Sequence, residues 1–338
     1  MPSPAPVPDP WWLDAHLDLA YLDLQGPSIT GELPDAAARG VSLAALARGG
    51  VRLACATIFT ELGADAPWGY RDHDDVEGAF RAGVAQLERY DAMERAGILR
   101  IARSAADVAA AADAAEDRRW APLTVVLLME CADPIRSPDE AAWWHARGVR
   151  MVGLSWGAGS RYSGGNVRDG GITPTGRDLV QALDALGMIH DASHLSDRSF
   201  DDLCTLSDRV IVATHSNARA RLAPSPRHLA DAQMHEIARR GGMVGLNLYG
   251  RFLASGRPAT LEDALDHVEH AASIVGRERT GLGSDFDGGF TPMDCPAGCG
   301  RPEELGALLA GLEARGWSER ERTGFAHANW LRVLTSGG

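Results

Sequence analysis

The chain consists of short apolar, β-branched runs that alternate with longer amphipathic segments rich in alanine and leucine. This alternation is typical of βα units around a parallel sheet. The candidate strands are Leu13–Leu19, Val51–Phe59, Leu123–Met129, Val149–Leu154, Met188–Ser193, Val210–Thr214, Met243–Leu248 and Thr280–Ser284. Eight such units predict a closed (β/α)8 barrel, and a single barrel with its helices commonly fills a chain of this length. We therefore expect an α/β fold with one TIM-type barrel domain over residues 1–338.

The segments between these runs carry helix signals. Ser104–Asp117 is rich in alanine, the best helix former, and Pro174–Leu186 and Leu261–Val275 have helical patterns. Glycines expected at helix C-termini are Gly49, Gly187, Gly241 and Gly276. The alternative fold is a doubly wound open sheet, which would usually have a glycine-rich nucleotide turn after its first strand. No such turn is present, so the barrel is favoured.

The composition restricts both partners and chemistry. The formal net charge is −13, and no basic run offsets it, which argues against binding to nucleic acid. All 33 basic residues are arginine. The chain therefore cannot form a lysine Schiff base, and it cannot use a carbamylated lysine to bridge two metals. Any metal bridge must come from a carboxylate.

The sequence also gives expectations about location. The N-terminal segment MPSPAPVPDPWW lacks the basic start and apolar core of a secretory signal, and no stretch approaches the length of a membrane span. Five scattered cysteines suit reduced thiols, so we expect a cytoplasmic protein that does not bind membranes. Cys295 and Cys299 could pair or hold a metal, but no second cysteine pair or nearby histidine supports a structural zinc.

Side chains that can bind metal stand at the ends of five expected strands. They are His16 and Asp18 on the first, Glu130 after the third, His194 after the fifth, His215 after the sixth and Asp285 after the eighth. In a barrel, the carboxyl ends of all strands converge on one face. Histidine nitrogen and carboxylate oxygen suit zinc, and the set exceeds what one tetrahedral zinc needs. It therefore predicts two ions about 3.5–4 Å apart, with a bridging carboxylate and hydroxide.

Five motifs make the pattern more specific. HLD, LME, DASH, HSNAR and GSDFDG, in this order and spacing, resemble those of the renal (membrane) dipeptidase family, which is placed among the metal-dependent amidohydrolase-like barrels. The resemblance extends from His16 to the C-terminal AHANWLRVL. It implies a (β/α)8 barrel, a binuclear zinc site and dipeptide hydrolysis, and hence a cytosolic zinc metallo-dipeptidase of the bacterial type.

The resemblance also implies roles for single residues. His16 and Asp18 would hold the first zinc, Glu130 would bridge, and His194 and His215 would hold the second. Asp285 would contact the bridging water and shuttle its proton. The arginine that binds the substrate carboxylate would be Arg227 in SPRHLAD, and Arg219 of HSNAR is its competitor.

Three further positions bear on the site. Trp156 stands where dipeptidases of the family often have a histidine that helps to bind the substrate. An indole N–H can donate one hydrogen bond but cannot become a cation. Tyr249, just after the seventh expected strand, lies on the active face as a candidate substrate contact. Strand alternation places His190 on the same side as His194, in the barrel interior or behind the ligands, and a structural role is the preferred interpretation.

These residues predict hydrolysis of dipeptides with a free C-terminal carboxylate, including those with a D-residue at the C-terminus. A hydroxide that bridges the metals would attack the scissile carbonyl, with Asp285 as general acid–base. One alternative is an amidohydrolase acting on a non-peptide amide, an N-acyl amino acid or a lactone, which Trp156 keeps open. A second is a non-catalytic metal-binding relative, which the complete six-residue set disfavours. Family members commonly form homodimers, so the resemblance also suggests a homodimer.

Overall fold

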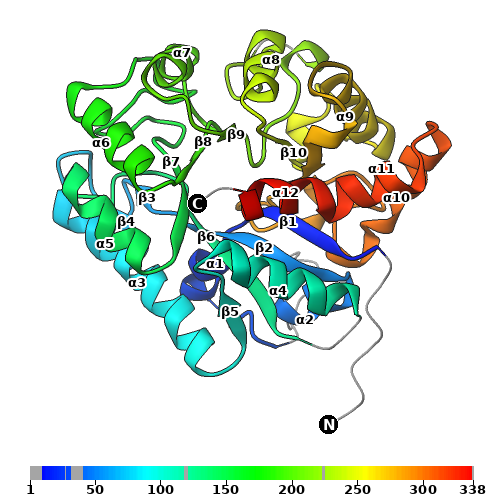
Figure 1. Ribbon diagram of the computed structural model, residues 1–338, viewed down its shortest axis with the longest axis horizontal. Helices are drawn as coiled ribbons and strands as arrows, with labels where there is room; N and C mark the ends of the chain where they lie inside the picture. The colour runs from blue at the N-terminus through cyan, green and yellow to red at the C-terminus, as the bar shows by residue number, and fades with distance from the viewer. Residues whose placement is uncertain (1–9, 27, 32–40, 118–120, 223–224, 337–338) are drawn as a thin grey trace.

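The computed structural model describes residues 10–26, 28–31, 41–117, 121–222 and 225–336, and a parallel barrel lies at its centre (Figure 1). The barrel strands are β1 (Trp12–Leu17), β2 (Val51–Ile58), β6 (Leu123–Met129), β7 (Val149–Gly153), β8 (Ile189–Asp191), β9 (Ile211–Val212), β10 (Val244–Leu246) and β11 (Thr280–Leu282). They pair in the order β10-β11-β1-β2-β6-β7-β8-β9, and all these pairings are parallel. The predicted (β/α)8 barrel is confirmed.

The seam between β9 and β10 is narrow. A single parallel bridge, Ala213 to Val244, joins the two ends of the strand order, so the sheet closes on itself and is not an open one. Glycine is required beside this seam because backbones approach closely there. A Cβ atom would lie 1.9 Å from the Thr214 carbonyl oxygen if added to Gly245, and 1.7 Å from it if added to Gly283.

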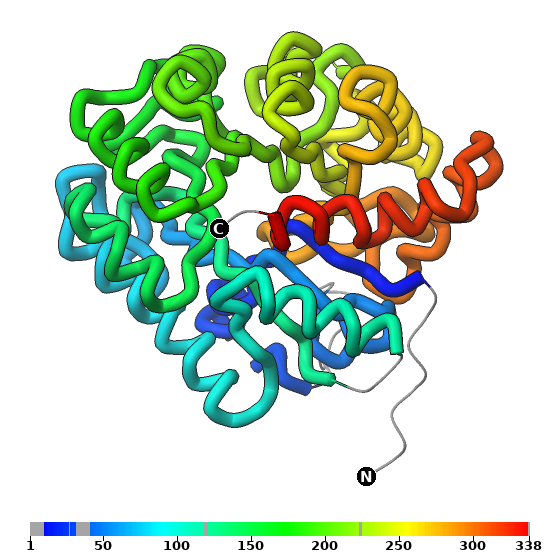
Figure 2. The backbone as a smooth tube through the Cα atoms, in the orientation of Figure 1, coloured from blue at the N-terminus to red at the C-terminus, as the bar shows by residue number. Residues whose placement is uncertain are grey.

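Helices surround the strands, as the backbone trace also shows (Figure 2). They are α1 (Leu19–Gln25), α2 (Leu43–Arg48), α3 (Val76–Arg95), α4 (Ala105–Glu116), α5 (Ala141–Ala146), α6 (Pro174–Ala185), α7 (Asp197–Leu206), α8 (Asp231–Arg239), α9 (Leu261–Val275), α10 (Gly306–Ala314), α11 (Glu319–Thr323) and α12 (Asn329–Ser336). The short strands are β3 (Glu61–Leu62), β4 (Gly69–Tyr70) and β5 (Leu99–Ile101). Short 3₁₀ segments are Pro138–Glu140, Arg219–Arg221, Gly250–Phe252, Arg277–Arg279, Pro292–Asp294 and Pro302–Glu304, and Gly324–Ala328 is a π-helical turn.

Helix boundaries follow the predicted signals closely. The side chain of Ser104 caps α4 by accepting from the backbone N–H of Asp107, and α9 has the predicted bounds. Gly276 ends α9 with a φ of 86°. Most strands are shorter than predicted, and β9 is reduced to Ile211–Val212, whereas β6 has the predicted bounds. The sequence did not predict β3, β4 or β5.

Two apolar clusters lie on the two faces of the strands. Alternate residues of β2 and β6, such as Leu53 and Leu128, pack in one cluster with Trp330 of α12. The residues between them, such as Ala54 and Leu127, pack in the other cluster with the surrounding helices. Glu130 continues the alternation of Val126 and Leu128, so it stands on the same face as the first cluster.

No helix in the part of the chain that the structure describes is long and apolar enough to cross a membrane. All five cysteines are free. Cys295 and Cys299 are buried, and no potential metal-binding group among the described residues includes them.

Candidate metal centre

The six predicted metal-site residues come together at the carboxyl end of the barrel. His16 is on β1 and Asp18 precedes α1, while the other four lie in the segments that follow β6, β8, β9 and β11. Five of the six are buried, and the side chain of His194 is 10% exposed. The convergence occurs because parallel strands all end on the same face of a barrel.

Glu130 lies between two pairs of these residues. Its Oε2 atom is 3.5 Å from His16 Nε2, which in turn is 3.8 Å from Asp18 Oδ1. Its Oε1 atom is 3.3 Å from His194 Nε2 and 3.4 Å from His215 Nε2. Two groups of potential ligands therefore share one carboxylate, and within each group the ligand atoms lie within 4.8 Å of one another. A bridging carboxylate requires this arrangement.

The histidine nitrogens of the cluster are suited to binding cations. Burial lowers the pKa of His194 to about 4 and that of His215 well below its usual value, and the Arg227 charge acts in the same direction on both. Both imidazoles are therefore neutral. Their Nε2 atoms lie 3.0 Å apart. The Nε2 atom of His16 has no hydrogen-bond partner among the described residues. Neutral imidazole nitrogens beside buried carboxylates are the donor set of zinc sites.

Two carboxyl groups and one imidazole of the cluster have shifted pKa values. Burial raises the pKa of Asp18 and of Asp285, and the nearby charge of Glu130 raises both further. Burial alone would lower the pKa of His16, but the charges of Glu130 and Asp18 raise it to about 10. The cluster therefore gathers buried negative charge that a divalent cation would offset.

Backbone strain is concentrated at the same place. His194 has a φ of 68° and Asp285 a φ of 59°, and these are the only two described residues other than glycine with positive φ. This region is uncommon for residues with a side chain and tends to occur at functional sites. Asn247 donates a hydrogen bond of 2.8 Å to Asp285, which helps to hold its carboxylate in place.

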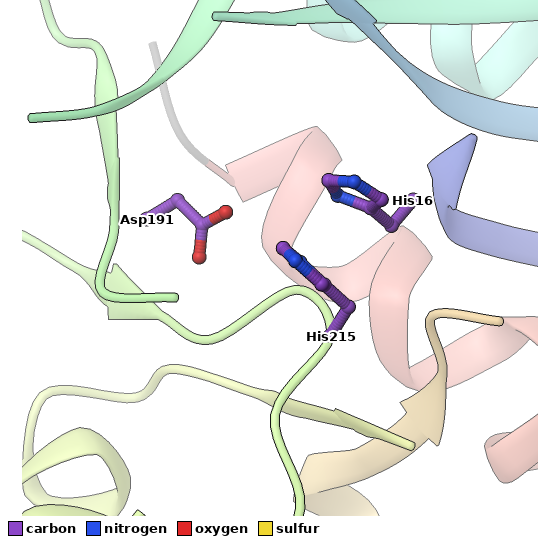
Figure 3. A group of neighbouring side chains, drawn as sticks. All are labelled: His16, Asp191 and His215. Carbon is purple, nitrogen blue, oxygen red and sulfur yellow. The ribbon is translucent and has the colours of Figure 1, made fainter. Parts of the chain in front are cut away.

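Asp191 lies near His16 and His215 (Figure 3), and the Thr214 hydroxyl contacts all three side chains. The Thr214 hydroxyl donates to Asp191 Oδ2 at 2.6 Å, and its oxygen is 2.9 Å from His215 Nδ1 and 3.5 Å from His16 Nδ1. A hydroxyl has one proton and two lone pairs, so it can accept from both Nδ1–H groups. When each neutral ring carries its proton on Nδ1, the Nε2 atoms of both rings are open toward Glu130. The two rings stack with centroids 3.6 Å apart.

Sequence reasoning missed Asp191. The structural role preferred for His190 agrees with the contact of its Nε2 atom to Asp184 of α6 at 2.6 Å, but His190 belongs to none of the potential ligand groups in the described chain. Asp191 instead forms such a group with His16 and His215. Sequence reasoning also missed two other polar residues at the site, Asn166 and Asp287. Asn166 Oδ1 lies 3.0 Å from His194 Nδ1, and Asp287 is buried with no hydrogen-bond partner in the described chain. Burial raises the pKa of Asp287 to about 7.

A cavity of about 240 Å³ opens over the metal-site residues. Its lining residues are Asp18, Tyr21, Phe59, Glu61, Glu130, Trp156, His194, Arg227, Tyr249, Phe252, Asp285, Gly288, Gly289 and Phe290. Three of the four predicted substrate contacts, Trp156, Tyr249 and Arg227, therefore line it. Trp156 is 38% exposed at its mouth, and Tyr249 stacks on Phe290.

The two candidate arginines have different surroundings. Arg219 forms a bidentate ion pair with Asp197, at 2.8 and 2.6 Å, and does not belong to the described lining of the cavity. Arg227 is buried and donates to the Ser216 hydroxyl and the His215 carbonyl oxygen. None of the described carboxylates forms an ion pair with Arg227. A buried guanidinium without an ion pair can bind an anionic ligand directly.

Comparison with known proteins gives a consistent result. The family model for membrane dipeptidases (peptidase family M19) matches residues 10–336. An uncharacterised Klebsiella pneumoniae protein from the pqqA 5′ region is 36% identical over 203 residues, which cover 56% of this chain and 73% of that protein. The dipeptidase tcpJ of Claviceps purpurea is 32% identical over 151 residues, or 43% of this chain, and the match spans 35% of that relative's length.

Solved structures match over almost the whole chain. A metallopeptidase from Rhodobacter sphaeroides, crystallised with a phosphinate mimic of the dipeptide L-Ala-D-Ala, superposes with a TM-score of 0.84 and 28% identity. The match covers 97% of this chain and 99% of that one. The dipeptidase AC, a metallopeptidase of family M19, has a TM-score of 0.83 and 30% identity, with coverage of 96% and 97%.

Proposed function

Because this chain belongs to the membrane dipeptidase family, we propose that it hydrolyses dipeptides with a free C-terminal carboxylate at a site for two zinc ions. The observation that carries the proposal is the position of Glu130. Its two oxygens face two separate pairs of potential ligands, which supports a bridged pair of ions over a single one.

Five residues would hold the metals. His16 and Asp18 would bind one ion, His194 and His215 the other, and Glu130 both. When bound, two zinc ions supply Lewis acidity and lower the pKa of a bound water toward neutrality. The protein contributes the positions of the ligands, because Thr214 and Asn166 contact their ring nitrogens from behind.

Arg227 would bind the C-terminal carboxylate of the substrate. It lines the cavity beside the metal-site residues and has no ion pair among the described residues, so its charge is available to a ligand. A positional contact of this kind limits substrates to short peptides, because the carboxylate must lie one residue from the scissile bond. Tyr249 lines the same cavity and would contact the bound peptide.

Asp285 would move the proton during hydrolysis. It lines the cavity, and the hydrogen bond from Asn247 holds its carboxylate. We assign it the general-base role of accepting a proton from the attacking water, and then the general-acid role of donating it to the leaving nitrogen. Burial raises the pKa of this carboxyl, which suits a group that must take up and release a proton.

Trp156 would shape the substrate preference. Its ring lies 5.5 Å from Phe59 and 5.7 Å from His194, so one side of the cavity is aromatic. Contact with such a wall favours large apolar side chains over glycine or alanine. The Rhodobacter sphaeroides relative binds a mimic of L-Ala-D-Ala, which supports extending the proposal to dipeptides with a C-terminal D-residue.

We further propose that residues 1–338 act as one catalytic domain, supported by the family match over 10–336. A cytoplasmic location agrees with five free cysteines. The homodimer stays a prediction, and gel filtration with light scattering would measure it.

The test is metal analysis by mass spectrometry together with hydrolysis of matched L-Xaa-L-Xaa and L-Xaa-D-Xaa dipeptides. We expect two zinc ions per chain and hydrolysis of free dipeptides. Arg227→Ala should raise KM sharply for these, whereas Arg219→Ala serves as the control. Equal turnover of free and C-terminally amidated dipeptides would remove the assignment and favour an amidohydrolase of another specificity.

A further inference from the structure

The cavity has a second charged wall opposite Arg227. Arg227 lies in the segment after β9, and Glu61 lies in the segment after β2. Around the ring of eight strands, three strands separate β2 from β9 in either direction. Both residues line the cavity, and the strand order brings them there from opposite sides of the barrel.

Glu61 is held in place by hydrogen bonds to only one of its oxygens. The Tyr21 hydroxyl donates to Oε2 at 2.8 Å, and the Trp68 indole N–H donates to the same atom at 3.2 Å. No hydrogen bond or ion pair within the described residues uses Oε1. Burial and the hydrogen bond to Glu61 raise the pKa of Tyr21, so this partner stays neutral and adds no charge to the pair. The result is an oriented carboxylate with one oxygen open to a ligand.

An aromatic surface connects Glu61 to the metal-site residues. The ring of Tyr21 lies 4.9 Å from Phe59, and Phe59 lies 5.5 Å from Trp156, which reaches toward His194. Such rings pack against the aliphatic stem of a long basic side chain, and their faces attract its cationic end. The wall is therefore suited to a group that is apolar along its length and positive at its tip.

We propose that Glu61 binds a cationic group of the substrate residue on the amino side of the scissile bond, and so gives preference to arginine or lysine there. The inference rests on the proposed dipeptidase function, with the C-terminal carboxylate at Arg227. A substrate with an anionic end and a cationic end is then oriented across the cavity by two opposite charges. The α-ammonium group and a basic side chain offer the same chemistry, so the experiment must distinguish them.

The experiment compares wild-type protein with Glu61→Gln on four substrates: arginyl-alanine, citrullyl-alanine, alanyl-alanine and propionyl-alanine. Citrulline has the shape of arginine without its charge, and the propionyl compound lacks the α-ammonium group. Glutamine keeps an oxygen that can accept from Tyr21 and Trp68. Glu313→Gln, an exposed position on α10, removes the same charge away from the cavity.

We expect Glu61→Gln to raise KM for arginyl-alanine by about tenfold or more, since a hydrogen bond to a charged partner is lost. If the side chain is the ligand, the three uncharged-side-chain substrates and the Glu313→Gln control stay unchanged. If the α-ammonium group is the ligand, KM rises for all substrates except propionyl-alanine, and the preference for arginine or lysine is overturned. An unchanged KM for arginyl-alanine, or an equal rise for all four compounds, would overturn the proposal.

A binding measurement separates this inference from the proposed function. Calorimetric titration of metal-depleted protein with arginyl-alanine and citrullyl-alanine gives affinities without turnover. Tighter binding of the arginyl compound, lost in Glu61→Gln, supports the inference even if the metal-loaded protein cleaves neither compound. Equal affinities in wild-type protein would overturn it even if dipeptides are hydrolysed.

Discussion

The two ends of the barrel are filled with opposite kinds of side chain, although the same strands supply both. Toward the base, Val126 and Leu128 of β6 pack with Met151 of β7 and Trp330 of α12. Two residues further along the same face, Glu130 stands among three histidines. The base therefore contributes burial of apolar surface, and the mouth gathers buried polar groups of the kinds that bind metal. Substitutions at the two ends should affect different measurements.

Glu130→Gln should have the largest effect, because one side chain faces both ligand pairs. The change keeps the size of the residue and removes its charge. We expect zinc content well below two ions per chain and loss of detectable dipeptide hydrolysis, with the circular dichroism spectrum unchanged. Mass spectrometry of the desalted protein measures the metal. Full occupancy of one zinc site in this variant would contradict a shared bridge.

Asp285→Asn should leave the metals in place and remove the proton transfer. We expect kcat to fall by a factor on the order of 10²–10⁴, as is usual for a general acid–base. Zinc content should stay within error of the wild-type value. If zinc is lost together with activity, Asp285 is a metal ligand and its assigned role is wrong.

Thr214→Val should weaken both proposed zinc sites, because one hydroxyl contacts the Nδ1 atoms of His16 and His215. Loss of such a supporting hydrogen bond typically lowers metal affinity about 10–100-fold. Competition with a chromophoric chelator measures the affinity of each site, and Thr214→Ser, which retains the hydroxyl, is the matched control. Weakening of only one site would limit the contact to His215, the nearer ring.

Leu128→Ala tests the base, and it should have the smallest effect on activity. Removing this buried side chain should lower the free energy of unfolding by about 2–5 kcal/mol. Urea titration followed by fluorescence measures the loss. In the protein that remains folded, zinc content and kcat should stay within about twofold of wild type. A large fall in kcat would show that packing at the base also positions Glu130.

The sequence alone predicted the barrel and the six residues that the structure gathers at its mouth. This was possible because a polar residue directly after an apolar run has only one place to lie in a parallel barrel. Glu130 is of this kind, whereas His16 lies near the end of β1 and His215 follows β9 after Thr214. The motif resemblance added expected roles, which periodicity alone does not provide.

Residues behind the ligands were harder to predict. Alternation was continued from His194 back to His190, but the positive φ of His194 breaks the strand geometry on which that count depends. Counting within β8 alone would have favoured Asp191. The choice between Arg219 and Arg227 depended on Asp197, which forms the ion pair with Arg219 from a different helix. A contact between distant segments of this kind leaves no local pattern.

The single bridge at the barrel seam also has a dynamic consequence. The hydrogen bonds there are few: Ala213 N–H to the Met243 carbonyl, Gly245 N–H to the Ala213 carbonyl and Ser216 N–H to the Gly245 carbonyl. His215 follows β9 on one side of this seam, and His16 is on β1 on the other side, where β10 and β11 lie between β1 and the seam. Two ions joined through Glu130 would link His215 to His16 and so connect the two sides of the seam. Amide hydrogen exchange at Gly245 should then accelerate on chelation, while exchange in β2 and β6 stays slow.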